Sequence, residues 1–369
     1  MAAARLEPRY ALDTEFHREQ TYFPRLGLVQ LAWPGRVILV DPLAVSPEPL
    51  GELLDSPATA ITHAPDQDLE ILQHAVGRVP NRLFDTQTAA GFCGMRSPSL
   101  QDLLDRFLDV QVPKGDRLSD WLRRPLKPQQ LDYAANDVRH LLDLHDRLHA
   151  ALAARDRLAW CEEECEKLRL RVASPRQPEE AWLRVRELRR LPRRSQPMAL
   201  AVAAWRERRA AALDLPPRYV LSDLALAAVV QAAPRTRAAL DAVRGVDHRA
   251  VAGAPGAELL EVISQARRNP PRIAPALTAN RRSHLQPVAA LVSAWLSQVA
   301  RDDELDPALV ATRADLESFL EGRPGARLAG GWRYERYGFR VEELVAGKAA
   351  VALEPGGTLR LERRSGHPL

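Results

Sequence analysis

The spacing of apolar residues changes near residue 50, and this change constrains the fold more than any other feature of the sequence. Before it, three apolar segments follow one another with short gaps, at residues 10–16, 26–33 and 36–41. Apolar and polar residues alternate in the first segment, and Pro34 and Gly35 provide a tight turn between the other two. The first 42 residues therefore predict an antiparallel meander of three strands.

After residue 50 the apolar residues recur at helical spacing, with one further strand predicted at residues 59–63. A meander followed by alternating helix and strand is typical of a mixed sheet covered by helices. We expect an α/β domain of this kind over residues 1–170.

The rest of the chain predicts helices in two groups. Residues 171–194, a basic stretch bounded by prolines, are interpreted as a basic helical linker to a first group at 195–270, where Ser222 is the expected N-cap of one helix. A second linker, 271–284, precedes a second helical group at 285–369.

The two helical groups share a sequence pattern. The runs AWRERRAAALDLPP, from Ala204, and AWLSQVARDDELDP, from Ala294, both begin with Ala-Trp, continue as a helix and reach Leu-Asp shortly before a proline. This pattern indicates a duplicated helical module in which Trp205 and Trp295 anchor the two cores.

Composition restricts the class of protein only loosely. A chain of 369 residues exceeds what one hydrophobic core usually serves. The net charge of +4 is compatible with a polyanionic partner, but four of the 52 basic residues are Lys, and an arginine bias of this kind also arises from GC-rich coding. Three cysteines without a CxxC pair favour free thiols, and no long apolar run is present, so we expect a cytoplasmic, soluble protein.

Two carboxylates lie on the first predicted strand. The side-chain period of two places Asp13 and Glu15 on one face of this strand. Two unpaired acids on an otherwise apolar strand cost several kcal/mol when buried, so the pair favours a bound cation. A strand at a solvent-facing edge would show the same pattern.

Two later segments supply further polar groups. Asp68 lies in the first turn of a predicted helix, where acids are also common because they complement the helix dipole. Tyr133 and Asp137 are four residues apart and share one face of a helix predicted over residues 131–144. Each segment alone is a weak indication. Together they would gather four carboxylates and one phenol, and clustered carboxylates repel one another unless a cation neutralises them.

In their order and flanking residues, the three segments resemble the exonuclease motifs of the DEDD superfamily, in the subclass whose third motif carries tyrosine. More narrowly, the chain is similar to ribonuclease D in the runs ALDTEF, TYFPRLGLVQL, HAPDQDLEIL, FDTQTAA, SDWLRRPL and YAANDVRHL. The helical groups resemble the HRDC (helicase and RNase D C-terminal) domain and a diverged partner. The resemblance implies a ribonuclease H-like mixed sheet with flanking helices, which is α/β, followed by two all-α HRDC-type domains.

The same resemblance implies a metal-dependent 3′ to 5′ exoribonuclease that releases 5′-mononucleotides and trims stable RNAs such as transfer RNA precursors. Its cofactors would be two divalent metal ions, Mg²⁺ or Mn²⁺. No membrane and no obligate protein partner are implied. By motif position, the catalytic residues would be Asp13, Glu15, Asp68, Tyr133 and Asp137. The four acids would hold the metal ions, Asp68 through water, while Tyr133 would orient the attacking water.

Residues that flank the motifs are candidates for substrate contacts. We expect this role for His63, Gln67 and Tyr22, although Tyr22 could equally pack beneath the meander, and for Lys114 and Arg117 in a loop before the third motif. Arginines of the first helical group and of the preceding linker would bind phosphates: Arg206, Arg208, Arg209, Arg235, Arg237, Arg244, Arg189, Arg190, Arg193 and Arg194.

Two readings compete with an exoribonuclease: a 3′ to 5′ DNA exonuclease, whose motifs are the same, and a nucleic-acid-binding protein without catalysis. Two departures from the family pattern are also present. Only twelve residues precede Asp13, where family members carry a helix and a strand, so we expect either a missing edge strand or a start further upstream. Lys127 occupies a helix N-cap position for which it is poorly suited.

Overall fold

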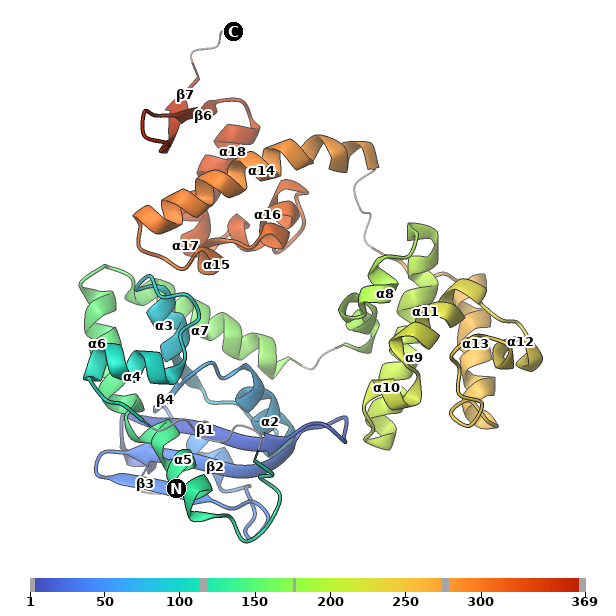
Figure 1. Cartoon of the computed structure of the whole chain (residues 1–369), viewed down its shortest axis with the longest axis horizontal. Helices are drawn as coiled ribbons and strands as arrows, with labels where there is room; N and C mark the ends of the chain where they lie inside the picture. Colours follow the sequence, from blue (N-terminus) through green and yellow to red (C-terminus); the bar gives the residue numbers. More distant parts are fainter. Residues whose placement is uncertain (1–3, 113–118, 175–176, 274–278, 365–369) are drawn as a thin grey trace.

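The computed structural model describes residues 4–112, 119–174, 177–273 and 279–364 and divides the chain into an α/β unit and two helical units (Figure 1). The α/β unit combines a mixed sheet with flanking helices, in agreement with the predicted fold class. Within the described ranges no helix is long and apolar enough to cross a membrane.

The sheet of the α/β unit has five strands in the order β3-β2-β1-β4-β5. The strands are β1 (Arg9–His17), β2 (Arg25–Trp33), β3 (Arg36–Val40), β4 (Thr59–Thr62) and β5 (Arg82–Asp85). The first three form the predicted antiparallel meander, and β4 and β5 run parallel to β1. Strand β5 was not predicted; its pairing with β4 is a contact between segments about 20 residues apart, which a local pattern does not show. The edges of the sheet are β3 and β5, and β1 is its central strand.

Helices cover both faces of the sheet. Alternate residues of β1 therefore pack into two different hydrophobic cores, one on each face. Tyr10 and Leu12 pack with α1 (Leu50–Leu54) and α2 (Asp66–Val76). Ala11 belongs to the opposite core, which continues into the second helical unit and receives apolar residues from five helices of the α/β unit. These helices are α3 (Thr86–Gly91), α4 (Leu100–Leu108), α5 (Pro128–Arg139), α6 (Leu141–Ala153) and α7 (Leu158–Ala173). Asp13 and Glu15 point to the same side as Ala11, below α5 and α6.

The first helical unit begins before the predicted position. Its elements are the 3₁₀ helix η2 (Pro178–Arg184), α8 (Arg186–Arg189), α9 (Gln196–Leu213), α10 (Pro217–Val220), α11 (Asp223–Ala232), α12 (Arg237–Asp241) and α13 (Ala254–Arg268). Ser222 caps α11 as expected, since its side chain accepts from the N–H of Ala225. Trp182 and Leu188, placed in a linker by the sequence prediction, are buried in the same core as Trp205. The amphipathic stretch thus belongs to this unit, because its apolar face needs a partner.

The second helical unit ends in a β-hairpin. Its helices are α14 (Ala279–Asp302), α15 (Pro307–Val310), α16 (Arg313–Leu320), α17 (Gly331–Arg333) and α18 (Phe339–Val345). Strands β6 (Ala349–Leu353) and β7 (Leu359–Arg363) pair antiparallel, so this segment is not helical throughout. Trp295 is 2% exposed, as expected of a core anchor, and lies in a hydrophobic core that this unit shares with the α/β unit.

A buried ion pair joins α7 of the α/β unit to the second helical unit. Both terminal nitrogens of the Arg333 guanidinium, Nη1 and Nη2, donate to the carboxylate of Glu164, and the Arg333 side chain is 0% exposed. Burial would raise the pKa of Glu164, but Arg333 and Lys167 lower it to about 2. The guanidinium also lies 4.5 Å from the ring centre of Trp332, which stacks on Trp160 of α7.

We therefore expect Glu164→Gln to reduce the free energy of unfolding by about 3 kcal/mol or more, because the change leaves the buried charge of Arg333 without its partner. Urea denaturation measures the loss. The matched control is Glu166→Gln, which breaks an exposed pair with Arg169 on the same helix and should cost less than about 1 kcal/mol. Equal losses in the two variants would contradict a special role for Glu164.

Candidate active site

Three carboxylates meet where the centre of the sheet passes under α5. One carboxylate oxygen from each of Asp13, Glu15 and Asp137 lies within 4.8 Å of the others. Asp13 and Glu15 project from the same face of β1, and Asp137 comes from α5, which packs across β1, β2 and β3. The structure thus brings together three of the four predicted metal ligands.

Helix α5 fixes the positions of Asp137 and Tyr133. It begins with Pro128, whose missing N–H suits the first turn of a helix. The Gln130 side chain accepts from the N–H of Lys127 at 3.0 Å, which offsets the poor capping residue predicted there. The helix is interrupted at His140, which separates α5 from α6. The prediction of one continuous helix over residues 131–144 is therefore wrong. The break allows α5 to lie over the carboxylates while α6 covers the core beside them.

The fourth acid, Asp68, is held beside the strand rather than within the group of three. Its carboxylate accepts from the backbone N–H of Thr14 at 3.1 Å and from the Thr14 hydroxyl at 2.5 Å. Strand β4 pairs with β1 only as far as Ala11, so the edge of β1 beyond that residue is open to the first turn of α2. The Asp68 carboxylate therefore accepts the N–H that a neighbouring strand would otherwise accept. The residue that it contacts, Thr14, lies between Asp13 and Glu15 in β1.

The electrostatics of the cluster favour a cation. Burial, followed by repulsion from Asp68, Asp137 and Glu15, raises the pKa of Asp13 well above its usual range. Burial and the neighbouring carboxylates raise the pKa of Glu15 to about 8. The pKa of Asp68 rises to about 6 through burial, although its hydrogen bonds with Thr14 oppose the shift. A bound cation would neutralise this repulsion. Carboxylate oxygens are the ligands that Mg²⁺ and Mn²⁺ prefer.

An open cleft of about 410 Å³ lies against the cluster. Its lining residues are Asp13, Glu15, His63, Gln87, Ser97, Pro98, Ser99, Leu100, Gln101, Leu104, Val112, Tyr133, Asn136 and Asp137. Polar residues of this lining, such as Gln87, Gln101 and Asn136, were not predicted as site residues. The FDTQTAA run contained Gln87, but no periodicity in the sequence shows that residues 97–101 line the same cleft as the carboxylates.

His63 is one of the residues that line this cleft. Its Nδ1 is 2.9 Å from the hydroxyl of Thr86, and that hydroxyl donates to the carbonyl of Thr62. Since the hydroxyl proton is used there, Nδ1–H of His63 is the donor to Thr86. Burial lowers the pKa of His63, against the opposing effect of Asp85.

The other predicted substrate contacts have different outcomes. Gln67 is exposed on α2 and is not among the described residues that line the cleft. Lys114 and Arg117 lie outside the described residues. Tyr22 corrects the prediction: its hydroxyl donates to Glu207 at 2.9 Å, and its ring packs against the core of the first helical unit. A side chain committed to this contact between units is not placed to bind the terminal nucleotide.

The segment from residue 119 to residue 126 braces Tyr133. Trp121 is 3% exposed, as predicted for a packing residue, and its ring centre lies 6.2 Å from that of Tyr133. Arg124 donates to both carboxylate oxygens of Asp41, at 2.6 and 2.7 Å, and to the carbonyl of Gly27 at 2.7 Å. A Cβ at Gly27 would lie 2.8 Å from the Trp121 carbonyl, so only glycine allows this close approach.

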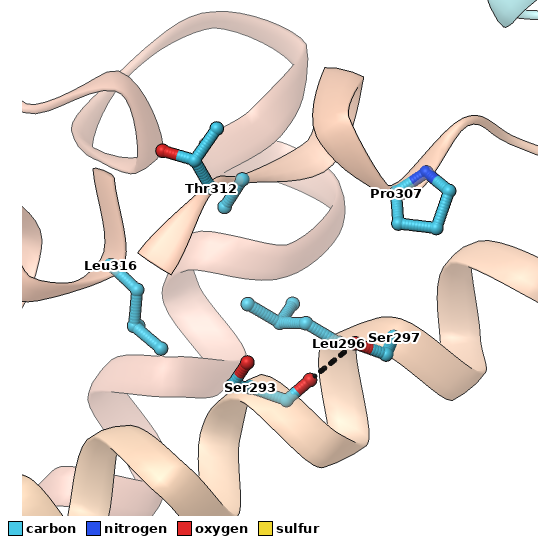
Figure 2. Close-up of a pocket in the computed structure, with 7 residues that line it drawn as sticks. Ser293, Leu296, Ser297, Pro307, Thr312 and Leu316 are labelled. Carbon is cyan, nitrogen blue, oxygen red and sulfur yellow. Dashed lines mark hydrogen bonds between the residues drawn. The ribbon is translucent and has the colours of Figure 1, made fainter. Parts of the chain in front are cut away.

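A second hollow, in the last helical unit, has no such chemistry. Figure 2 shows its lining from α14 and from the region of α15 and α16, with the Ser297 hydroxyl donating to the Ser293 carbonyl. Its volume is about 20 Å³, and none of its lining residues ionises at neutral pH. The cleft beside the carboxylates is therefore the candidate active site.

Two sequence families match the chain. Residues 2–153 match the 3′-5′ exonuclease family, and residues 197–263 match the HRDC domain. Together with the mixed sheet and the carboxylate cleft, these matches define a 3′-5′ exonuclease that carries an HRDC domain.

Individual relatives narrow this class. The chain is 35% identical to ribonuclease D of Granulibacter bethesdensis, over 95% of this chain and 90% of that protein. It is 37% identical to ribonuclease D of a Jannaschia species, over 95% and 93% of the two chains. The crystal structure of Escherichia coli RNase D, described as an exoribonuclease involved in structured RNA processing, has a TM-score of 0.84 and 29% identity, with 94% and 95% of the chains covered. The chain belongs to the ribonuclease D family and is a 3′-5′ exoribonuclease, whose family chemistry uses divalent metal ions.

The raised pKa values predict how metal and pH act on stability. A folded-state pKa above the unfolded value means that the metal-free fold is most stable with its acids protonated. Stability is then lost as the pH rises through about 6 for Asp68 and about 8 for Glu15. We expect the melting temperature in EDTA to fall between pH 6 and pH 8, and the increase produced by Mn²⁺ to grow over the same interval. Differential scanning fluorimetry measures both.

The control for this experiment is Glu15→Gln, which removes one of the titrating acids and should flatten the dependence on pH in EDTA. The exposed Asp132 of α5 offers a matched change, Asp132→Asn, which should leave it intact. An increase with Mn²⁺ that is the same at every pH would contradict the assignment.

Proposed function

We propose that this exoribonuclease acts in the cytoplasm and trims the 3′ ends of structured stable RNAs, such as transfer RNA precursors, by two-metal hydrolysis that releases 5′-mononucleotides. The observation that carries the proposal is the group of Asp13, Glu15 and Asp137 at an open cleft. Asp68 is held beside this group by its hydrogen bonds with Thr14. The RNA substrate is supported by similarity to a relative described as acting in structured RNA processing. The free thiols support a reducing compartment.

The side chains would divide the work unequally. Asp13, Glu15 and Asp137 would hold one divalent ion, Mg²⁺ or Mn²⁺, and Asp13 would share a second ion with Asp68 through water. When bound, the ions lower the pKa of water and neutralise charge on the leaving oxygen. The ordinary pKa of a tyrosine hydroxyl is about 10, so this group stays protonated at neutral pH and is a poor base. Tyr133 would therefore orient the attacking water by a hydrogen bond. His63, Gln67, Lys114 and Arg117 remain predicted substrate contacts.

Single-turnover degradation of 3′-labelled RNA in Mn²⁺ tests these roles. Asp13→Asn should abolish the loss of label because it removes the shared ligand. Tyr133→Phe should slow the loss on the order of 100-fold or more while Mn²⁺ binding, measured by calorimetry, is retained. An unchanged rate in Tyr133→Phe would sink its assignment. Faster loss from labelled DNA than from RNA would favour a DNA exonuclease, and no metal-dependent loss from either would favour a binding protein.

Four of the ten arginines predicted to contact RNA form ion pairs within the first helical unit. Arg206 is 4% exposed and pairs with Asp223, while Arg208, Arg209 and Arg237 pair with Glu179, Glu258 and Asp241. These four are therefore poor phosphate ligands, which corrects that part of the sequence prediction. The reason is that the helices of this unit bring an acid close to each of them.

An arginine segment just before α9 is better suited to phosphates. Arg189, Arg190 and Arg194 are exposed, and none of them forms an ion pair with another described residue. They lie within six residues of chain, so their charges add at the surface. The proposal assigns to this segment contacts with the RNA backbone beyond the terminal nucleotide.

Replacing Arg189 and Arg190 together by Ala should weaken binding to a structured RNA. It should also make the slope of log affinity against log salt less steep by about 1.5, because two phosphate contacts are lost and each contributes about 0.7–0.9 to the slope. Filter binding at several salt concentrations measures this change, and hydrolysis of a short single strand should stay the same. The control is Arg208→Ala, since Arg208 is already paired with Glu179. An unchanged slope in the double variant would exclude the segment from RNA binding.

A further inference from the structure

The side chain of Gln30 is buried near the carboxylate cluster without a hydrogen-bond partner. It is 0% exposed, and neither its Oε1 nor its Nε2 has a partner among the residues that the structure describes. A buried amide in this condition costs on the order of 1–3 kcal/mol. Since an apolar side chain of similar volume would avoid this cost, a glutamine here requires an explanation.

The register of the sheet places Gln30 beside Asp13. The two residues are direct partners in the antiparallel pair of β1 and β2. Residues opposite each other in such a pair project from the same face, with Cβ atoms about 4.5–5.5 Å apart. On the other side of Gln30 the register partner is Leu39 of β3, and the neighbours on the same face along β2 are Leu28 and Ala32. Among these neighbours, Asp13 is the polar one.

We propose that Gln30 is a positioning residue for Asp13: its Nε2–H donates to the carboxylate oxygen that Asp13 turns toward the sheet when Asp13 binds a divalent ion. The inference deepens the proposed function and rests on it. An ionised carboxylate offers about four acceptor positions, and metal ions on the cleft side leave the inner ones to be satisfied. Donors that fix a metal ligand in this way contribute about 10- to 100-fold in metal affinity.

The chemistry of an amide suits this position. An arginine or lysine would also donate to Asp13, but its charge would compete with the metal ion for the carboxylate. A serine or threonine would be too short to span neighbouring strands, which lie about 4.8 Å apart. Glutamine is long enough and uncharged, so it can orient Asp13 and leave the negative charge of the cluster to the metal ion.

The experiment separates positioning from packing by measuring two quantities on the full chain. Gln30→Met keeps the length and approximate volume of the side chain and removes both polar atoms. We expect the dissociation constant for Mn²⁺, measured by isothermal titration calorimetry, to rise at least tenfold. The melting temperature in EDTA should stay the same or rise, because a buried amide without a partner has been removed. Exonuclease activity of the variant should recover as the Mn²⁺ concentration is raised.

A matched control lies on the same sheet. The hydroxyl of Tyr10 is also buried without a partner among the described residues, but Tyr10 projects from the opposite face of β1. Tyr10→Phe should therefore leave the melting temperature in EDTA the same or higher while leaving Mn²⁺ affinity unchanged.

Two results would overturn the proposal: Mn²⁺ affinity of Gln30→Met within twofold of the wild type, or a loss of affinity accompanied by a lower melting temperature in EDTA. The second result would show that Gln30 supports the fold rather than Asp13. Gln30→Leu repeats the test with a different packing shape. Failure of the wild-type protein itself to bind Mn²⁺ would instead refute the proposed two-metal function, so the two failures are distinguishable.

Discussion

Repulsion among buried carboxylates on the central strand is the constraint on which the arrangement of the α/β unit depends. Asp13 and Glu15 must share a face of β1 because of the strand period, and α5 adds Asp137 to the same group. Burial raises the pKa of Asp13 and Glu15, so the cluster opposes the fold whenever these acids are ionised without a cation. The surrounding packing must hold the group together until a metal ion neutralises it.

Separate features of the structure provide this support. The short pairing of β4 with β1 leaves the Thr14 N–H to Asp68, which fixes the fourth acid outside the group of three. The close approach of Trp121 to Gly27 braces the ring of Tyr133. The acids and the tyrosine therefore hold different positions before any substrate is bound, which is the preorganisation that hydrolysis requires.

Local patterns in the sequence predicted much of this arrangement, and long-range packing accounts for what they missed. The strand period placed Asp13 and Glu15 together, and helical spacing placed Tyr133 one turn from Asp137. Strand β5 was missed because its pairing with β4 is a long-range contact. The run VALEPGGTLRLE is strand-like in the sequence, which left open whether the last segment is fully helical, and it lies in the hairpin of β6 and β7. The contact of Tyr22 with Glu207 joins residues 185 positions apart, and no local pattern could reveal it.

The central claim is that Asp13, Glu15 and Asp137 bind a divalent ion directly, while Asp68 acts through water. A crystal of the protein soaked in Mn²⁺, with anomalous diffraction recorded near the manganese absorption edge, would locate the ion. We expect an anomalous peak about 2.0–2.3 Å from oxygens of these three residues, with the Asp68 oxygens farther away. A peak coordinated directly by Asp68, or no peak within the cluster, would contradict it.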